Sequence, residues 1–242
     1  MENETKVGLN QTGMQMSPIQ GGKQVEYAQQ MPPHPAEGSE ENIALLRGTY
    51  VVEALRVGSV PIPATGKGVV ETVVGKLKGD SPEVLFDKLG ERAAYERSGV
   101  RLYQAMMSKV KVSEHPDRAA LLADLEHICE EEFQHFKMLS QAVTDLGGDP
   151  TAQTPCADIS AVAAMGLIQV LTDPRTTLAQ GLQALLTAEL TDYACWEMLI
   201  ELVEQSGHDD LIAPFQKALA SEEEHEAKIK QWLRKLVMEE AL

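Results

Sequence analysis

Cysteine, basic side chains and long apolar runs are all scarce in this sequence, and each shortage excludes a class of protein. The 242 residues include three cysteines, Cys129, Cys156 and Cys195, and no two of them form a Cys-x-x-Cys pair. This number and spacing predict neither a disulfide framework nor a thiolate zinc site. We therefore expect reduced thiols and a cytoplasmic protein.

Basic residues are outnumbered by acidic ones. Lys and Arg total 21 against 37 Asp and Glu, which gives a formal net charge of −16 at pH 7. Nucleic acids are bound through clustered Lys and Arg, and anionic membrane surfaces also attract basic segments, so neither is an expected partner. An acidic exterior instead favours solubility and attracts small cations.

No apolar run is long enough to indicate a membrane protein. The longest, ISAVAAMGLIQVL at 159–171, is shorter than a bilayer span and contains a Gln. The N-terminus is polar and Gln-rich, without the apolar segment of a signal peptide. The sequence therefore predicts a soluble protein with no membrane partner.

The composition divides the chain into three parts. Residues 1–40 are rich in Gln, Gly, Pro and Met, so we expect them to be disordered or to form an arm over the partner chain of a homodimer. Residues 41–80 predict a short helix at 41–57 and a loop, both packed on the rest of the chain. Residues 81–242 show helical apolar spacing and no period-two alternation, which argues against a sheet.

The third part predicts an all-α fold. Ser81-Pro82 is a typical helix start, and the Gly-Gly-Asp-Pro at 147–150 is a typical stop. A long connection, 147–178, contains a short apolar helix around 157–171. The expected long helices are 81–109, 116–146, 178–205 and 209–239. Four long helices with one long crossover favour a four-helix bundle.

Each long helix carries a carboxylate on its apolar face, and two of them carry a His three residues later. Stepping along the apolar positions by three and four residues identifies this set: Glu96, Glu132, His135, Glu189, Glu222 and His225. The glutamates beside them in the sequence fall off the apolar faces. We expect those to be solvated: Glu130, Glu131, Glu223 and Glu224.

Four carboxylates in one buried layer require compensating positive charge. Burying an unpaired ionised carboxylate is costly, and carboxylates at close range repel or raise one another's pKa. Two divalent cations would bring four positive charges against four negative ones, with neutral imidazoles completing the coordination. Residues at i and i+3 share a helix face, so a Glu-x-x-His pair suits one metal.

The segments YERSGVRLY, EEEFQHF, TAELTDYACW and SEEEHEA resemble the ferritin-like superfamily of di-metal carboxylate proteins over roughly residues 81–242. The resemblance implies a ferritin-like bundle that holds two iron ions, with manganese as the alternative. The implied roles are bridging for Glu132 and Glu222, terminal for Glu96 and Glu189, and one metal each for His135 and His225.

Five further side chains are candidates for the surroundings of the metals. Asp192 follows Glu189 by three residues and is placed to accept a histidine N–H. Arg92 precedes Glu96 by four residues and is placed to pair with it. Tyr103 and Trp196 are interpreted as core residues or redox partners, and Cys129 as a cavity-lining or inert packing residue.

The resemblance implies a di-iron oxidoreductase that acts on O₂ or peroxide. Three alternatives stay open: a ferroxidase or iron-handling protein, a manganese catalase-like enzyme, and a non-catalytic bundle stabilised by metal. The N-terminal arm and the helical insert depart from shell-forming ferritins. The lack of Cys-x-x-Cys pairs departs from rubrerythrin-like proteins, so we expect an external electron donor.

Overall fold

The computed structural model describes residues 18–31, 40–78 and 81–242, and within these ranges the regular elements are all helices. The chain divides into two units between Arg56 and Val57. The N-terminal unit contains α1 (Pro18–Gln30) and α2 (Glu40–Glu53). The α2 helix was predicted, whereas α1 lies in the segment 1–40 that was expected to be disordered or arm-like. Residues 1–17 and 32–39 of that segment lie outside the described residues.

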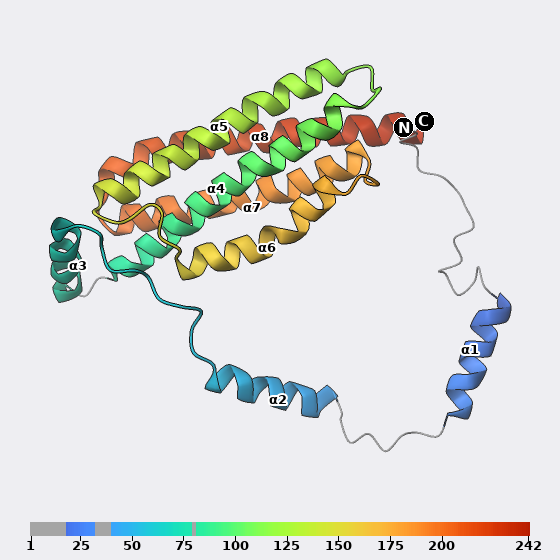
Figure 1. Ribbon diagram of the computed structural model, residues 1–242, viewed down its shortest axis with the longest axis horizontal. Coiled ribbons are helices and arrows are strands. Elements are labelled where there is room, and N and C mark those ends of the chain that lie inside the picture. Colours follow the sequence, from blue (N-terminus) through green and yellow to red (C-terminus); the bar gives the residue numbers. More distant parts are fainter. Residues whose placement is uncertain (1–17, 32–39, 79–80) are drawn as a thin grey trace. The chain divides into compact units, whose positions relative to one another are not determined.

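The second unit contains four long helices and two shorter ones (Figure 1). Helix α4 (Pro82–Lys111) packs along α5 (Arg118–Asp145), and α7 (Leu178–Gln205) packs along α8 (Asp209–Ala241). Contacts of α4 with α7 and of α5 with α8 close the bundle. The crossover between α5 and α7 contains α6 (Pro155–Thr172), which packs on α4 and α7. The predicted all-α bundle with one long crossover is confirmed.

Local capping explains where several helices begin. Thr154 precedes α6, and its hydroxyl accepts the N–H of Ala157 at 3.3 Å. Thr177 precedes α7 and forms a capping box with Gln180, which satisfies two N–H groups that would lack partners. Proline at the first helical position also opens α4 and α6.

Helix α3 (Gly66–Lys78) was not predicted. Its valines have low helix propensity, but Thr65 caps it by accepting the N–H of Gly68 at 3.1 Å. Thr65 also donates its own N–H to the carbonyl of Gly147, at 3.2 Å. Gly147 has φ of +82°, a left-handed conformation that favours glycine at the end of α5. Tertiary contact with this turn therefore holds a helix that its own sequence supports weakly.

Helix α6 extends slightly beyond the predicted apolar helix at 157–171. It has 18 residues, and by length and composition alone it is the one described helix that could cross a membrane. The buried share of this helix is 17%. Large apolar side chains on its outer face are exposed, including Ile159, Val162 and Met165.

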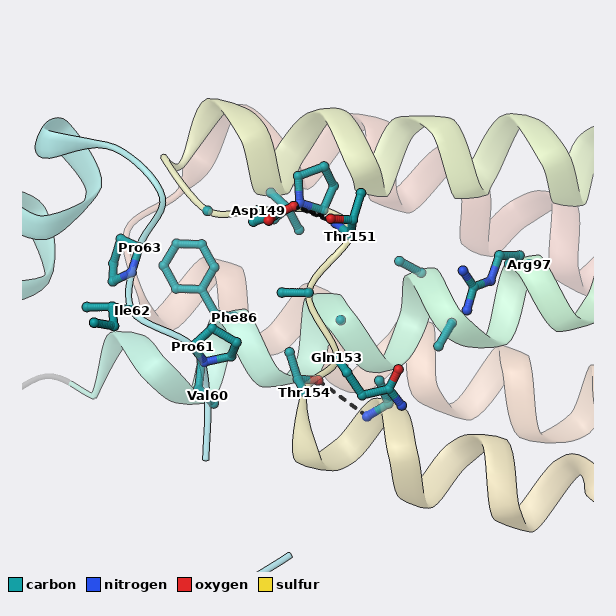
Figure 2. A pocket seen from close by; sticks show the side chains of 18 of the residues that line it. Val60, Pro61, Ile62, Pro63, Phe86, Arg97, Asp149, Thr151, Gln153 and Thr154 are labelled. Carbon is teal, nitrogen blue, oxygen red and sulfur yellow. Dashed lines mark hydrogen bonds between the residues drawn. The ribbon is translucent and has the colours of Figure 1, made fainter. Parts of the chain in front are cut away.

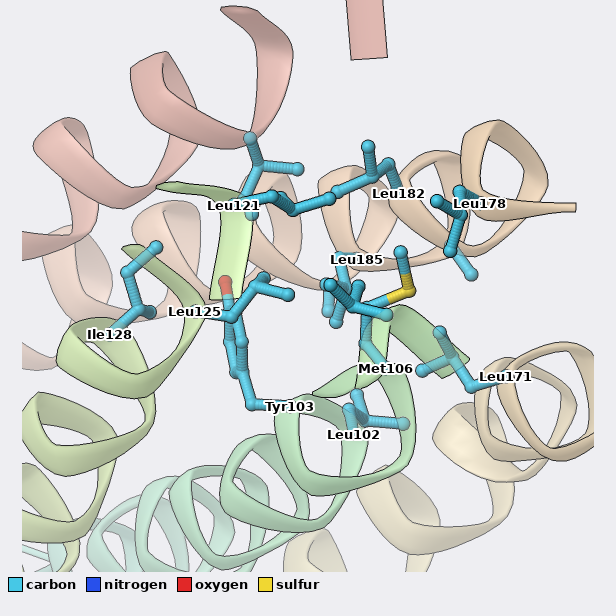
Figure 3. Close-up of a cluster of buried hydrophobic side chains, with 14 of the residues drawn as sticks. Leu102, Tyr103, Met106, Leu121, Leu125, Ile128, Leu171, Leu178, Leu182 and Leu185 are labelled. Carbon is cyan, nitrogen blue, oxygen red and sulfur yellow. The ribbon is translucent and has the colours of Figure 1, made fainter. Parts of the chain in front are cut away.

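The core of the bundle consists of two apolar clusters separated along the helix axes. One contains Leu121, Leu125, Leu182 and Leu185 together with Met106 (Figure 3). The other contains Leu89, Leu139, Leu199 and Phe215. All four long helices contribute to both clusters, and each carries its buried carboxylate in the stretch between them.

Candidate metal centre

The six predicted side chains meet in the layer between the two apolar clusters. All of them are buried, and His135 is the most exposed at 7%. Their ligand atoms form overlapping groups in which every pair of atoms lies within 4.8 Å. One group is Glu132, Glu189, Glu222 and His225, and another is Glu96, His135 and Glu222. Glu222 belongs to both groups, which is the arrangement expected of a bridging carboxylate.

Each imidazole directs Nδ1 at several carboxylates. Nδ1 of His225 lies 3.1 Å from Glu222, 3.5 Å from Glu132 and 3.6 Å from Glu189. Nδ1 of His135 lies 2.7 Å from Glu222 and 3.5 Å from Glu96. A single N–H cannot satisfy three carboxylates at once, whereas a metal ion accepts one nitrogen and several oxygens together.

The two terminal carboxylates are held from outside by aromatic donors. The hydroxyl of Tyr103 donates to Oε1 of Glu189 at 2.6 Å, and Nε1 of Trp196 donates to Oε1 of Glu96 at 2.8 Å. The other oxygen of each carboxylate, Oε2, is buried without a hydrogen-bond partner among the described residues. Tyr103 and Trp196 therefore fix both glutamates with one oxygen free, and both residues also pack in the core.

A buried ion pair lies beside Glu96. Nη2 of Arg92 is 2.5 Å from Oδ1 of Asp192 and 3.4 Å from Oε1 of Glu96. Asp192 is 2% exposed, and one of its oxygens lies within reach of Glu96, Glu132 and Glu222. The predicted pairing of Arg92 with Glu96 thus has a second and closer partner, which links α4 to α7.

Excess negative charge in this layer shifts several pKa values. Burial, together with the charges of Glu222, Glu96 and neighbouring Glu189, raises the pKa of Glu132 well above its usual range. Burial and the charge of Glu222 raise the pKa of Glu189 to about 8. Such upward shifts are typical of carboxylates that lack a compensating cation.

The pKa values of His135, His225 and Glu222 shift in the directions that favour protonated imidazoles and an ionised carboxylate. Burial acts against protonation of His135 and His225, but contacts with Glu222 and the other carboxylates raise both pKa values to about 9. Burial alone would raise the pKa of Glu222, yet its contacts with His135 and His225 lower it to about 2.

The donor set fits two divalent metal ions. Both oxygens of Glu132 are buried without hydrogen bonds among the described residues, as are the inner oxygens of Glu96 and Glu189. Unsatisfied buried carboxylate oxygens are costly in a protein core. Oxygen and imidazole nitrogen donors suit iron, manganese and zinc, so these atoms are compatible with a two-metal centre.

Gly99 provides the space that Glu132 occupies. A Cβ atom added to Gly99 would lie 2.1 Å from Oε2 of Glu132. Gly99 is buried within α4, where glycine is otherwise unfavourable by roughly 0.5–1 kcal/mol relative to Ala. The spacing analysis gave no role to this residue.

Glu131 has a role that the apolar periodicity missed. It was expected to be solvated, but its side chain is only 33% exposed and Oε2 lies 3.0 Å from Nε2 of His225. His127, one turn earlier on α5, also approaches Glu131 at 3.4 Å. The contact crosses from α5 to α8, so periodicity within one helix could not reveal it. Glu130, Glu223 and Glu224 are exposed, as expected.

Two residues that neighbour the candidate ligands in the sequence, Tyr193 and Cys129, are half-buried. Tyr193 lies on α7 next to Asp192, and Asp192 is the buried one of the two. Cys129 is half-buried, with Sγ 3.7 Å from the carbonyl of Val100, and burial raises its thiol pKa. Among the described residues it has no polar contact with a candidate ligand.

A solvent-open pocket of about 760 Å³ lies on the outside of the α4–α5 pair (Figure 2). Pro61, Ile62 and Phe86 form part of its wall, and Arg97 lies at its edge. None of the six candidate ligands lines this pocket, so the pocket is separate from the candidate metal centre.

Comparisons with known proteins identify the family of the chain. A comparison with curated proteins gives no match. Among solved structures, the chain is similar to a ferritin-like, diiron-carboxylate protein from Bacillus anthracis str. Ames, with 19% sequence identity and a TM-score of 0.49 over 62% of this chain and 94% of that one. The family model described as Ferritin-like domain matches residues 86–238, which include all six candidate ligands. The chain therefore belongs to the ferritin-like domain family.

Proposed function

We propose that this protein binds two iron ions in its bundle core and acts as an oxidoreductase on O₂ or peroxide. The observation that carries the proposal is the position of His225, whose Nδ1 faces oxygens of three different buried carboxylates within 3.6 Å. Glu132 and Glu222 would bridge the metals, with Glu96 and Glu189 as terminal ligands. His135 and His225 would bind one metal each.

Bound iron would supply the electron-transfer chemistry that O₂ and peroxide require. The protein's own contribution is geometry and exclusion of water. Tyr103 and Trp196 hold the terminal carboxylates in place through their hydrogen bonds. Apolar clusters close the layer on both sides, so charges inside it interact more strongly than they would in water. Electrons would come from an external donor.

The test is metal content per chain together with the absorption spectrum and the turnover of peroxide and O₂. We expect about two irons per chain in the wild type and fewer than one in Glu132→Gln or Glu222→Gln. The matched controls are Glu130→Gln and Glu223→Gln, which change exposed neighbours on the same two helices and should retain the full metal content.

Each alternative gives a different result in the same experiments. Many irons per chain in a large hollow assembly would indicate iron handling, and manganese with peroxide dismutation would indicate a catalase-like enzyme. Bound metal without turnover would indicate a structural role. A protein that takes up no metal, with an unchanged fold in the Gln variants, would contradict the two-metal centre itself.

A further inference from the structure

The two halves of the metal centre are not alike outside the ligands. On one side, Oε2 of Glu131 lies 3.0 Å from Nε2 of His225, while Nδ1 of that ring faces the carboxylates. A carboxylate at Nε2 keeps the proton on that nitrogen and leaves the lone pair of Nδ1 directed at the metal position. Contacts at both ring nitrogens therefore orient His225 for coordination through Nδ1.

The other side lacks this support. Glu131 directly precedes Glu132 on α5. The matching position on α8, directly before Glu222, is Ser221, which has no carboxylate. The hydroxyl of Ser221 donates to the carbonyl of Lys217 in its own helix, at 3.3 Å. No acidic side chain of the described residues lies within ion-pair distance of Nε2 of His135. Its ring instead packs edge-on against Trp196, with 5.8 Å between the centroids.

The surroundings of the two terminal carboxylates, Glu189 and Glu96, also favour metal binding on the His225 side. On the His225 side, Glu189 is held by a neutral partner, the hydroxyl of Tyr103. On the His135 side, Glu96 lies near the Arg92 guanidinium, with 3.4 Å between Nη2 and Oε1. A nearby cation weakens the attraction of a carboxylate for a metal ion, although Asp192 offsets part of the Arg92 charge.

We propose that the two metal positions differ in affinity: the position formed by Glu132, Glu189, Glu222 and His225 fills first, and Glu131 is the positioning residue that makes it the tighter one. The position at Glu96 and His135 fills second. This inference rests on the proposed two-metal function. It adds the order in which the two positions bind metal, and it attributes that order to Glu131, which is not one of the six proposed ligands.

The test is a calorimetric titration of metal-free protein with Co(II), followed in parallel by the visible absorption of bound Co(II). The wild type should show two steps of one ion per chain. His225→Ala should lose the first step, and His135→Ala should lose the second. Glu131→Ala should weaken the first step by about ten- to a hundredfold, the usual effect of removing such a partner, and leave the second unchanged.

Three comparisons separate positioning from a general loss of structure. Glu130→Ala, at the exposed neighbouring position, should leave both steps unchanged. Glu131→Gln retains an oxygen that accepts from Nε2 of His225, so it should keep more of the first step than Glu131→Ala. Ser221→Glu should strengthen the second step by supplying the missing carboxylate. Far-ultraviolet circular dichroism of each metal-free variant should match that of the wild type.

The possible failures are distinguishable. If the wild type binds no Co(II), the proposed two-metal function fails. If it binds two ions in one step of equal affinity, or if His135→Ala rather than His225→Ala removes the first step, the inequality is overturned while the metal centre stands. An unchanged first step in both Glu131 variants would remove Glu131 from its role.

Discussion

At the scale of single residues, the candidate metal centre depends on Gly99, which has no side chain. Gly99 leaves room for the carboxylate of Glu132, since a Cβ would approach Oε2 to 2.1 Å. The obstructed atom is the far end of a flexible side chain, so the helix can accept a methyl group if Glu132 turns away. A small change at Gly99 should therefore affect metal binding and leave the fold intact.

We predict that Gly99→Ala lowers metal content without destabilising the metal-free protein. Alanine is better than glycine in a helix by about 0.5–1 kcal/mol, which offsets the cost of moving Glu132. Metal analysis and thermal unfolding after chelation measure the two effects. Gly166→Ala is the matched control, because its added Cβ would meet nothing within 4 Å. Full metal content in Gly99→Ala would show that Glu132 is not needed in its present position.

At the scale of helices, periodicity predicts which side chains enter the core but not how helices pair across it. The 3.6-residue repeat is strong enough to identify the six inward-facing candidate ligands, because each lies between apolar residues of its own helix. Contacts between helices leave no such signal in one sequence. Two such contacts join residues far apart in the chain: the pairing of Glu131 with His225, and the hydrogen bond from the Tyr103 hydroxyl to Glu189. Packing, not local sequence, determines them.

The Arg92–Asp192 pair is the clearest contact of this kind. It joins α4 to α7 with both residues 2% exposed. Removing one partner of a buried ion pair leaves an uncompensated charge, which typically costs about 3–5 kcal/mol. We predict that Arg92→Met destabilises the metal-free protein by about this amount in urea unfolding. Arg92→Met combined with Asp192→Leu should recover much of the loss, because apolar replacement of both partners is often neutral.

The exposed Lys235–Asp117 pair provides the control for that measurement. It also joins two helical regions, with 2.5 Å between Nζ and Oδ2, but both side chains are about 40% exposed. Exposed pairs contribute about 0–1 kcal/mol, so Lys235→Met should have a small effect. Equal losses in Arg92→Met and Lys235→Met would contradict the importance assigned here to burial. A double variant no more stable than Arg92→Met would contradict the charge argument.

At the scale of the whole molecule, the stability of the fold depends on protonation and on metal binding in the buried layer of carboxylates and imidazoles. In the metal-free protein the pKa values of His135 and His225 are raised to about 9, and that of Glu189 to about 8. A group with a raised pKa stabilises the fold fully below its ordinary pKa and loses that contribution as the pH rises through the raised value. The pH range over which this stabilisation is lost is therefore about 6.5–9 for the imidazoles and about 4.5–8 for Glu189.

We predict opposite responses to pH with and without metal. From pH 6 to pH 8.5 the chelated protein should lose stability, with a fall of several degrees in Tm, because most of the imidazole range and the upper part of the Glu189 range lie between these pH values. A metal ion requires neutral imidazoles and ionised carboxylates, so its binding strengthens as protons leave. Bound Co(II) should then add more stability at pH 8.5 than at pH 6, and the difference in Tm between loaded and chelated protein should widen.

The same layer supplies the control for this pH effect. Glu189→Gln removes one titrating group and should flatten the pH dependence of the chelated protein, whereas Glu223→Gln changes an exposed residue and should leave it unchanged. A Tm of the chelated protein that rises from pH 6 to pH 8.5 would mean that the imidazoles are not held protonated by their carboxylates. The contacts of both rings with Glu222, 2.7 Å from Nδ1 of His135 and 3.1 Å from Nδ1 of His225, argue that they are, because a protonated imidazole donates from Nδ1 to a carboxylate at these distances.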